Sequence, residues 1–212
     1  MVVVAIIGIL AAIAIPNFIR FQARSKQSEA KHSLRAIFTG QKARFAEKEG
    51  YSTRLGDVAF QPERGNRYIY DLGSLGSGAG CAATDMEDRS TGVAVPGPGQ
   101  CGVQADVFRY GAAYAFGNLN DMTGSGVVTV SASMDGLTPV VPSGTVVGVY
   151  GTCPACGFSA AARGNVDKDP SVDVFLISSD FLGVAVAPCV DDAITPDTPG
   201  SPLGVRSDVL CE

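Results

Sequence analysis

The sequence lacks the residue patterns that catalysis usually requires. It contains a single histidine, His32, which stands near Lys31 and Arg35 and is expected on a helix surface. It has no histidine pair at metal-ligand spacing, no nucleophile elbow and no glycine-rich phosphate loop. We therefore predict a protein that is not an enzyme, that uses no cofactor and that binds no nucleotide.

Positive charge is scarce over most of the chain. The 212 residues carry a net charge of −5, with a pI near 4.9. A sequence-independent nucleic-acid surface needs a basic patch, so nucleic acid is not an expected partner. Half of the cations gather in one predicted helix and leave the remainder strongly acidic: Arg20, Arg24, Lys26, Lys31, Arg35, Lys42, Arg44 and Lys48.

The first fifteen residues have neither charge nor a hydrogen-bonding side chain, and they read MVVVAIIGILAAIAI. A buried core helix usually shows a polar side, which this run lacks. A signal peptide usually has a basic residue before its apolar run, and none stands here. A membrane anchor fits better, although fifteen helical residues rise only about 22 Å against a hydrocarbon core of about 30 Å.

The helical pattern continues beyond the apolar run. Pro16 lies inside it and should kink it, and Gly50 is a good stop signal. Apolar residues recur at i, i+3/i+4 and i+7, which predicts an amphipathic helix whose apolar stripe packs on a head domain. The predicted stripe consists of Ala30, Leu34, Ile37, Phe38, Gln41 and Phe45, with Leu34, Ile37, Phe38 and Phe45 as the predicted head core.

The rest of the chain has the alternation and turn residues of an antiparallel sheet, so the predicted fold class is α+β. Residues 73–104 are rich in Gly, Ser and Pro and are longer than an ordinary loop. No long element is predicted after Asp180. The predicted strands are Arg67–Leu72, Phe108–Phe116, Gly126–Met134, Val146–Val149 and a hairpin of Phe158–Arg163 with Val172–Ser178.

Residues Val3–Lys31 read VVAIIGILAAIAIPNFIRFQARSKQSEAK, and this stretch resembles the N-terminal helix of type IV pilins. Looser similarity returns in Phe60–Tyr68 and Gly164–Ile177. The resemblance implies a pilin fold, in which one long kinked helix packs on a β-sheet head with long loops. We accordingly divide the chain into an apolar helix half (1–22), an amphipathic helix half (23–50) and a head (51–212) with an insertion at 73–104.

The chain departs from this family at its beginning. Pilins have a basic leader, a cleavage site and about six further residues that include a glutamate. Aligned on this chain, that glutamate would fall two residues before Met1. We therefore expect an N-terminal truncation relative to the mature family form, and six more residues would give a helix of about 31 Å, a full membrane span.

Six cysteines beside an anchor indicate an oxidising compartment and disulfides. Six cysteines allow fifteen pairings, among which sequence does not choose. We favour neighbours, namely Cys81–Cys101, Cys153–Cys156 and Cys189–Cys211, and the last resembles the C-terminal disulfide loop of pilins (189–211). Cys153 and Cys156 also have redox-motif spacing, but no βαβ unit accompanies them, and a zinc site would need a second pair.

A cluster of acidic residues follows Gly164. Asp167, Asp169 and Asp173, with Asn165, can offer hard oxygen ligands to calcium, and related pseudopilins can bind it. The run lacks the glycine and final glutamate of an EF-hand loop. A solvated turn is the favoured interpretation, and these residues are only weak metal candidates.

The resemblance implies a structural subunit that polymerises into a type IV pilus for surface adhesion and twitching motility. Its expected partners are further copies of itself, the inner membrane before assembly and the pilus assembly machinery, and its final place is an extracellular filament. A minor pilin, a type II secretion pseudopilin and, from another class, a membrane-anchored adhesin remain alternatives. The predicted filament-core residues are Val3, Ile6, Ile7, Gly8, Ile9, Leu10, Ile13, Pro16 and Phe18.

Overall fold

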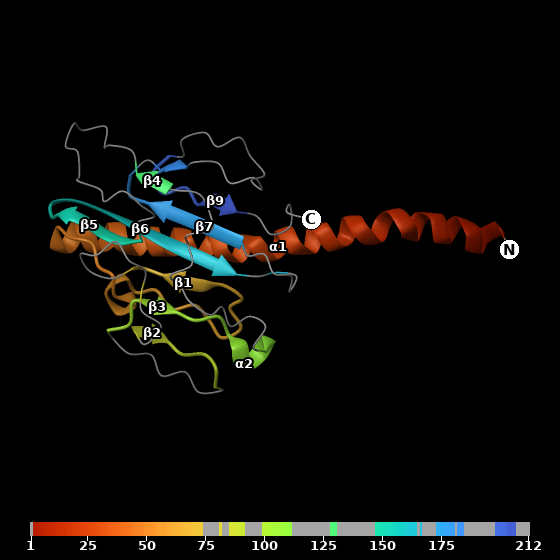
Figure 1. Cartoon of the computed structure of the whole chain (residues 1–212), viewed down its shortest axis with the longest axis horizontal. Coiled ribbons are helices and arrows are strands. Elements are labelled where there is room, and N and C mark those ends of the chain that lie inside the picture. The colour runs from red at the N-terminus through yellow and green to blue at the C-terminus, as the bar shows by residue number, and fades with distance from the viewer. Residues whose placement is uncertain are drawn as a thin grey trace.

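A computed structural model describes residues 2–73, 81, 85–91, 99–111, 128–130, 147–164, 166, 173–180, 182–184 and 198–206. A single long helix, α1 (Val2–Lys48), runs the length of the molecule. Its C-terminal half lies against a β-sheet head, and its N-terminal half projects from the head as a stem (Figure 1). This is an α+β arrangement of a long helix on a mostly antiparallel sheet.

The described strands form one seven-stranded sheet and a separate pair. Along the sheet the order is β2-β3-β1-β6-β7-β9, and β5 also pairs with β6. All pairings in the sheet are antiparallel except that of β2 with β3. The strands are β1 (Ile69–Asp71), β2 (Met86–Glu87), β3 (Gly102–Val103), β5 (Gly148–Thr152), β6 (Ala155–Gly164), β7 (Asp173–Ser178) and β9 (Leu203–Arg206), while β4 (Val128–Val130) pairs with β8 (Leu182–Val184).

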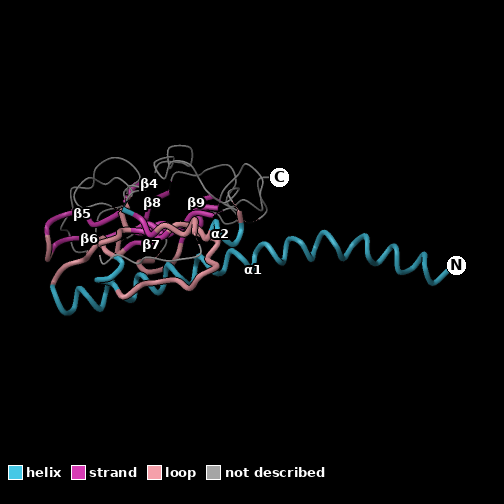
Figure 2. Tube along the Cα trace, turned by 90° about the horizontal axis from the view of Figure 1, so that it is seen from below, coloured by secondary structure: helices cyan, strands magenta, loops and turns pink. Residues whose placement is uncertain are grey.

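Strand β6 organises the sheet because it is long enough to serve several partners. On one side it pairs first with β5, from Ala155 to Ser159, and then with β1, from Ala161 to Arg163. On its other side it pairs with β7, where Gly164 stands opposite Asp173. The C-terminal half of helix α1 lies on one face of this sheet (Figure 2).

The core forms where the stripe on α1 meets β6 and β7. Ala30, Leu34 and Ile37 are fully buried, and they belong to one cluster with Ala160, Ala162, Phe175 and Ile177. Alternate residues of a strand face the same side, so each strand presents two of these side chains to the helix. The alanines of β6 are small and leave room for the bulkier side chains of the helix.

Two glutamines in the same stripe are buried and hydrogen-bonded. Gln27 donates to Oδ1 of Asp173 at 2.8 Å. Gln41 donates to the carbonyl of Ser52 and accepts from its N–H at 3.0 Å, which ties the segment after α1 back onto the helix. Because both glutamines have partners, their burial does not leave polar groups unpaired.

Phe38 and Phe45 are only half-buried. They lie at the flank of the stripe, where the ring of Phe38 is 5.8 Å from that of Phe158 and the ring of Phe45 is 4.7 Å from that of Tyr51. The centre of the helix–sheet contact is thus formed by alanine, leucine and isoleucine, and the predicted phenylalanines close its edge.

One sequence expectation is wrong, and the structure adds detail to two others. Phe108 to Tyr110 belong to a short helix, α2 (Val107–Tyr110), and not to a strand, because the Asp106 side chain caps it by accepting from the N–H of Arg109. The predicted insertion 73–104 supplies both β2 and β3. Two short strands, β8 and β9, follow Asp180, where no long element was expected.

Candidate assembly site

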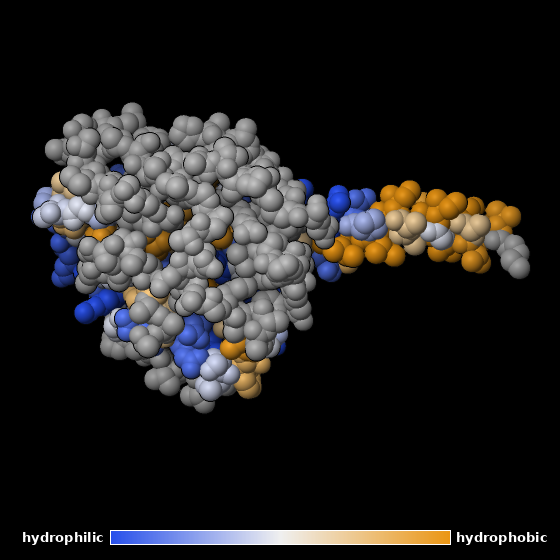
Figure 3. All heavy atoms as spheres, viewed as in Figure 1, coloured by the Kyte–Doolittle hydropathy of each residue, from blue (hydrophilic) through white to orange (hydrophobic). Residues whose placement is uncertain are grey.

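The stem is the part of the molecule whose chemistry most needs a partner. From Val2 to Gln22 every residue is exposed except the half-exposed Ala11, and the first buried residue of α1 is Ala23. The large apolar side chains of the stem are 52% to 73% exposed. Figure 3 shows them as a continuous hydrophobic surface that ends in hydrophilic residues beside the head. Soluble monomers rarely expose apolar surface on this scale.

All nine residues predicted for the filament core lie on this stem and are exposed. They surround the helix on every side, because residues at successive positions point about 100° apart. A helix that is apolar all round needs lipid or apolar protein around it. Within the described residues, α1 is the one helix that is long and apolar enough to cross a membrane, and none of its apolar window is buried.

Pro16 does not interrupt α1, which continues on both sides of it. Proline has no N–H to offer the carbonyl one turn before it. In the next position, the side-chain amide of Asn17 donates to the carbonyl of Ile13 at 3.1 Å. The position of Asn17 therefore adds a local donor beside the turn that proline weakens.

Of the predicted disulfides, Cys81–Cys101 and Cys153–Cys156 are formed, with Cα atoms 5.7 Å and 4.5 Å apart. The first is buried and links the start of the 73–104 segment to β3, and the second closes the exposed turn between β5 and β6. Cys189 and Cys211 lie outside the described residues.

The calcium candidate Asp173 points into the protein. Its Oδ1 accepts from Gln27 and its Oδ2 accepts from the hydroxyl of Tyr68, both at 2.8 Å. Both carboxylate oxygens of Asp173 are therefore occupied by groups from α1 and from the segment before β1. Asp167 and Asp169 lie outside the described residues, and no group of three metal-ligating side chains is found in the described part.

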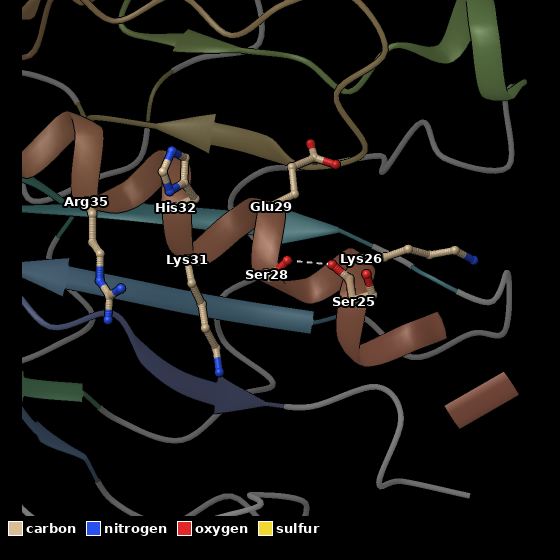
Figure 4. A pocket seen from close by; sticks show the side chains of 7 residues that line it. All are labelled: Ser25, Lys26, Ser28, Glu29, Lys31, His32 and Arg35. Atoms are coloured by element: carbon tan, nitrogen blue, oxygen red, sulfur yellow. Dashed lines mark hydrogen bonds between the residues drawn. The ribbon is translucent and has the colours of Figure 1, made fainter. Parts of the chain in front are cut away.

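The C-terminal half of α1 carries a pocket lined by side chains of both charges (Figure 4). Its lining residues are Ser25, Lys26, Ser28, Glu29, Lys31, His32 and Arg35. Lys31 and Arg35 point toward β7 and β9, whereas Glu29 points toward β1. Glu29 is held there by accepting from the N–H of Arg67 at 3.0 Å. His32 is exposed, as expected for a helix surface.

The exposure of one aromatic residue, Phe108, was not predicted from the sequence. Phe108 is 66% exposed, and among the described residues it is the one large hydrophobic side chain outside the stem with such exposure. It was predicted to lie in a strand, where its side chain would have packed on a face of the sheet. The preceding Asp106, a good helix cap, was the available signal.

Comparison with known proteins gives two matches. A family model described as type IV pilin PilA matches residues 21–173. The chain is also 41% identical, over 225 aligned residues, to a protein of Myxococcus xanthus (strain DK1622) named as type IV major pilin protein PilA. That alignment covers 100% of this chain and 90% of the relative. Both matches include the helix half that packs on the head.

Proposed function

Because this chain belongs to the type IV pilin family, we propose that it works as a structural subunit whose exposed apolar stem polymerises into a type IV pilus. Adhesion to surfaces and twitching motility are the general work of such filaments. The observation that carries the proposal is the stem itself, which exposes its large apolar side chains from Val2 to Phe21. A second copy of the same stem offers the apolar surroundings that it needs.

Before assembly, the stem is held in the inner membrane. Its described uncharged residues, from Val2 to Ile19, rise about 27 Å, close to the roughly 30 Å of a hydrocarbon core. Lipid surrounds an apolar helix as well as protein does, so transfer into a filament brings little hydrophobic gain. Close packing between stems must therefore supply the driving force. Gly8 offers a place for such close approach, because a Cβ added there would meet nothing within 4 Å outside its own stretch of helix.

In the filament, stems gather at the centre and heads lie outside. The stem and the head occupy opposite ends of the molecule (Figure 1), so successive subunits meet head to tail. A head-to-tail contact whose rotation does not close generates a helical fibre. The assembly machinery of the pilus is the expected partner for extension and retraction, since we assign neither a nucleotide site nor a catalytic role to this chain.

Electron microscopy distinguishes the proposal from its alternatives. In cells that express the full-length protein, antibody against the head should label abundant thin fibres along their length. Label only at fibre tips would indicate a minor pilin, and label confined to the membrane would indicate a pseudopilin or an anchored adhesin.

A matched pair of variants ties this result to the stem. Ile9→Ala with Ile13→Ala keeps the stem apolar but removes packing volume, and it should lower fibre yield while the protein stays in the membrane. Thr39→Ala on the exposed part of α1 is the control. Normal fibre yield from the stem variant would show that assembly does not depend on close packing there.

A further inference from the structure

Five of the eight cations of α1 form a line along one side of the helix. At about 100° and 1.5 Å per residue, they fall within an arc of about 60° and a length of about 33 Å. All of them are exposed. Lys31 Nζ lies 5.5 Å from the centre of the Phe175 ring, which places the line on the β7 side of the helix. We call this line the basic flank, and it consists of Arg20, Arg24, Lys31, Arg35 and Lys42.

Part of the basic flank has no opposite charge paired with it among the described residues. In the described part of the chain, Arg20 and Arg35 form no ion pair. Lys42 donates to the hydroxyl of Tyr51 at 3.0 Å, which leaves its charge unbalanced. Residues 1–48 hold eight cations and two carboxylates, whereas residues 49–212 hold eight cations and nineteen carboxylates. The head of another copy is therefore a source of opposite charge.

The opposite side of the head presents carboxylates. Strand β2 ends the sheet on the β1 side, and Figure 1 shows it across α1 from β7 and β9. Glu63, Asp85 and Asp88 are exposed around β2. Ser90 donates its N–H and its hydroxyl to the Asp88 carboxylate, at 2.8 Å and 3.0 Å, and these bonds hold the pKa of Asp88 below its usual range. Asp88 thus stays charged.

Phe108 gives this side an apolar centre. Its N–H donates to the carbonyl of Arg89 at 3.2 Å, which places it next to Asp88 in space. Two cations also lie on this side, the exposed Arg109 beside Phe108 and the partly exposed Arg64 near Asp88. We call Glu63, Asp85, Asp88 and Phe108 the acidic edge. An exposed aromatic residue with charged residues around it is a usual composition for a protein interface.

A buried ion pair holds the acidic edge in shape. Arg89 and Glu87 are each 1% exposed, and Arg89 Nε lies 2.8 Å from Glu87 Oε1. Arg89 also donates to the carbonyls of Pro62 and Glu63, both at 2.8 Å. One side chain therefore joins the segment that carries Glu63 to the segment that carries Asp88. The edge is organised before any partner arrives, which lowers the entropic cost of binding.

We propose that, in the filament, the basic flank of one subunit binds the acidic edge of a neighbouring copy. This inference rests on the proposed pilin function and names the head contact that accompanies stem packing. The two surfaces lie on opposite sides of one molecule, so the contact is heterologous, and a heterologous contact whose rotation does not close extends into a fibre. The basic flank also begins at Arg20, within the stem, which makes it continuous with the stem interface. Charge complementarity of this kind fixes the register between subunits more than it adds affinity.

Charge exchange in the full-length chain tests the contact. Lys31→Glu with Arg35→Glu reverses the flank, and Glu63→Lys with Asp88→Lys reverses the edge. Each pair alone should lower the yield of sheared fibres by about tenfold or more, because like charges then face each other. All four changes together should restore most of the yield. Arg54→Glu and Glu47→Lys, at exposed residues outside both surfaces, are the matched controls and should assemble normally.

The outcomes separate this inference from the proposed function. If the parent chain forms no fibres, the pilin function fails. If the parent forms fibres and the reversed variants do so equally well, the head contact is wrong and the function stands. Unrestored yield from the fourfold variant also overturns the pairing, provided that circular dichroism in detergent shows each variant folded.

A zero-length carbodiimide crosslink gives a second readout on parent fibres. It should join the amine of Lys31 to the carboxyl of Glu63, Asp85 or Asp88, and mass spectrometry of the peptides would identify the pair. The link should appear in fibres and not in detergent-dispersed subunits. Lys31 joined only to other carboxylates, or linked equally in dispersed subunits, would contradict the contact.

Discussion

Leu34→Ala tests whether the buried stripe of α1 holds the head together. Leu34 is 0% exposed and belongs to the main core cluster. Both leucine and alanine favour helix, so the change leaves α1 intact and removes packing alone. A buried Leu→Ala change costs about 2–5 kcal/mol. In a chain of this size each kcal/mol lowers the melting temperature by about 2–4 °C, so we expect a fall of about 4–20 °C.

The assay must report on the head and not on the stem. Far-ultraviolet circular dichroism would be dominated by α1, whose stem stays helical in detergent. Near-ultraviolet circular dichroism reports on tyrosines, of which Tyr68 and Tyr70 lie in the same core as Leu34. Thr39→Ala is the control, since Thr39 is exposed and its hydroxyl donates only to the carbonyl of Arg35 within the helix. Equal midpoints for Leu34→Ala and the parent would refute the stripe as the centre of the core.

Four further predictions follow from the described residues. Gly40→Val should lower the free energy of unfolding, because a side chain there would collide with the carbonyl of Val58, and an unchanged midpoint would show that α1 does not approach that segment so closely. Replacing Cys81 and Cys101 by serine should lower the free energy of unfolding in denaturant titrations by about 3 kcal/mol, because this disulfide joins residues 20 apart. The loss should exceed that from replacing Cys153 and Cys156, which are 3 apart, and the reverse order would contradict the loop-entropy reasoning. Burial raises the pKa of Asp71, so the stability that Asp71 contributes is present below its unfolded pKa and is lost as pH rises through its folded pKa. The Asp71→Asn variant can still accept from the N–H groups of Gly73 and Cys81 and should lose less stability over that pH range. Parallel profiles of stability against pH for variant and parent would contradict this. The stem between Gly8 and Pro16 should partly unwind in the filament, where neighbouring protein can pair freed backbone groups, and unbroken helical density there in a side-chain-resolution filament map would oppose this.

Much of the function could be predicted from sequence because it depends on local pattern. An apolar run followed by an apolar stripe at helical spacing determines a long helix with a stem and a packed half, whatever lies beyond it. The resemblance of Val3–Lys31 to type IV pilins is confirmed by the family match and by the full-length relative. The hairpin of β6 and β7 was also predictable, since its two strands are close in the chain.

What the tertiary structure decided depends on contacts between distant residues. Strands β2 and β3 are two residues each, too short to show a pattern, and they exist because a neighbouring strand pairs with them. The burial of Arg89 depends on carbonyl groups at Pro62 and Glu63, more than twenty residues away. The line of cations on α1 could be found from the sequence, but the side of the molecule on which it lies could not. Periodicity fixes which residues of a helix share a face, and only packing against the sheet fixes the direction in which that face points.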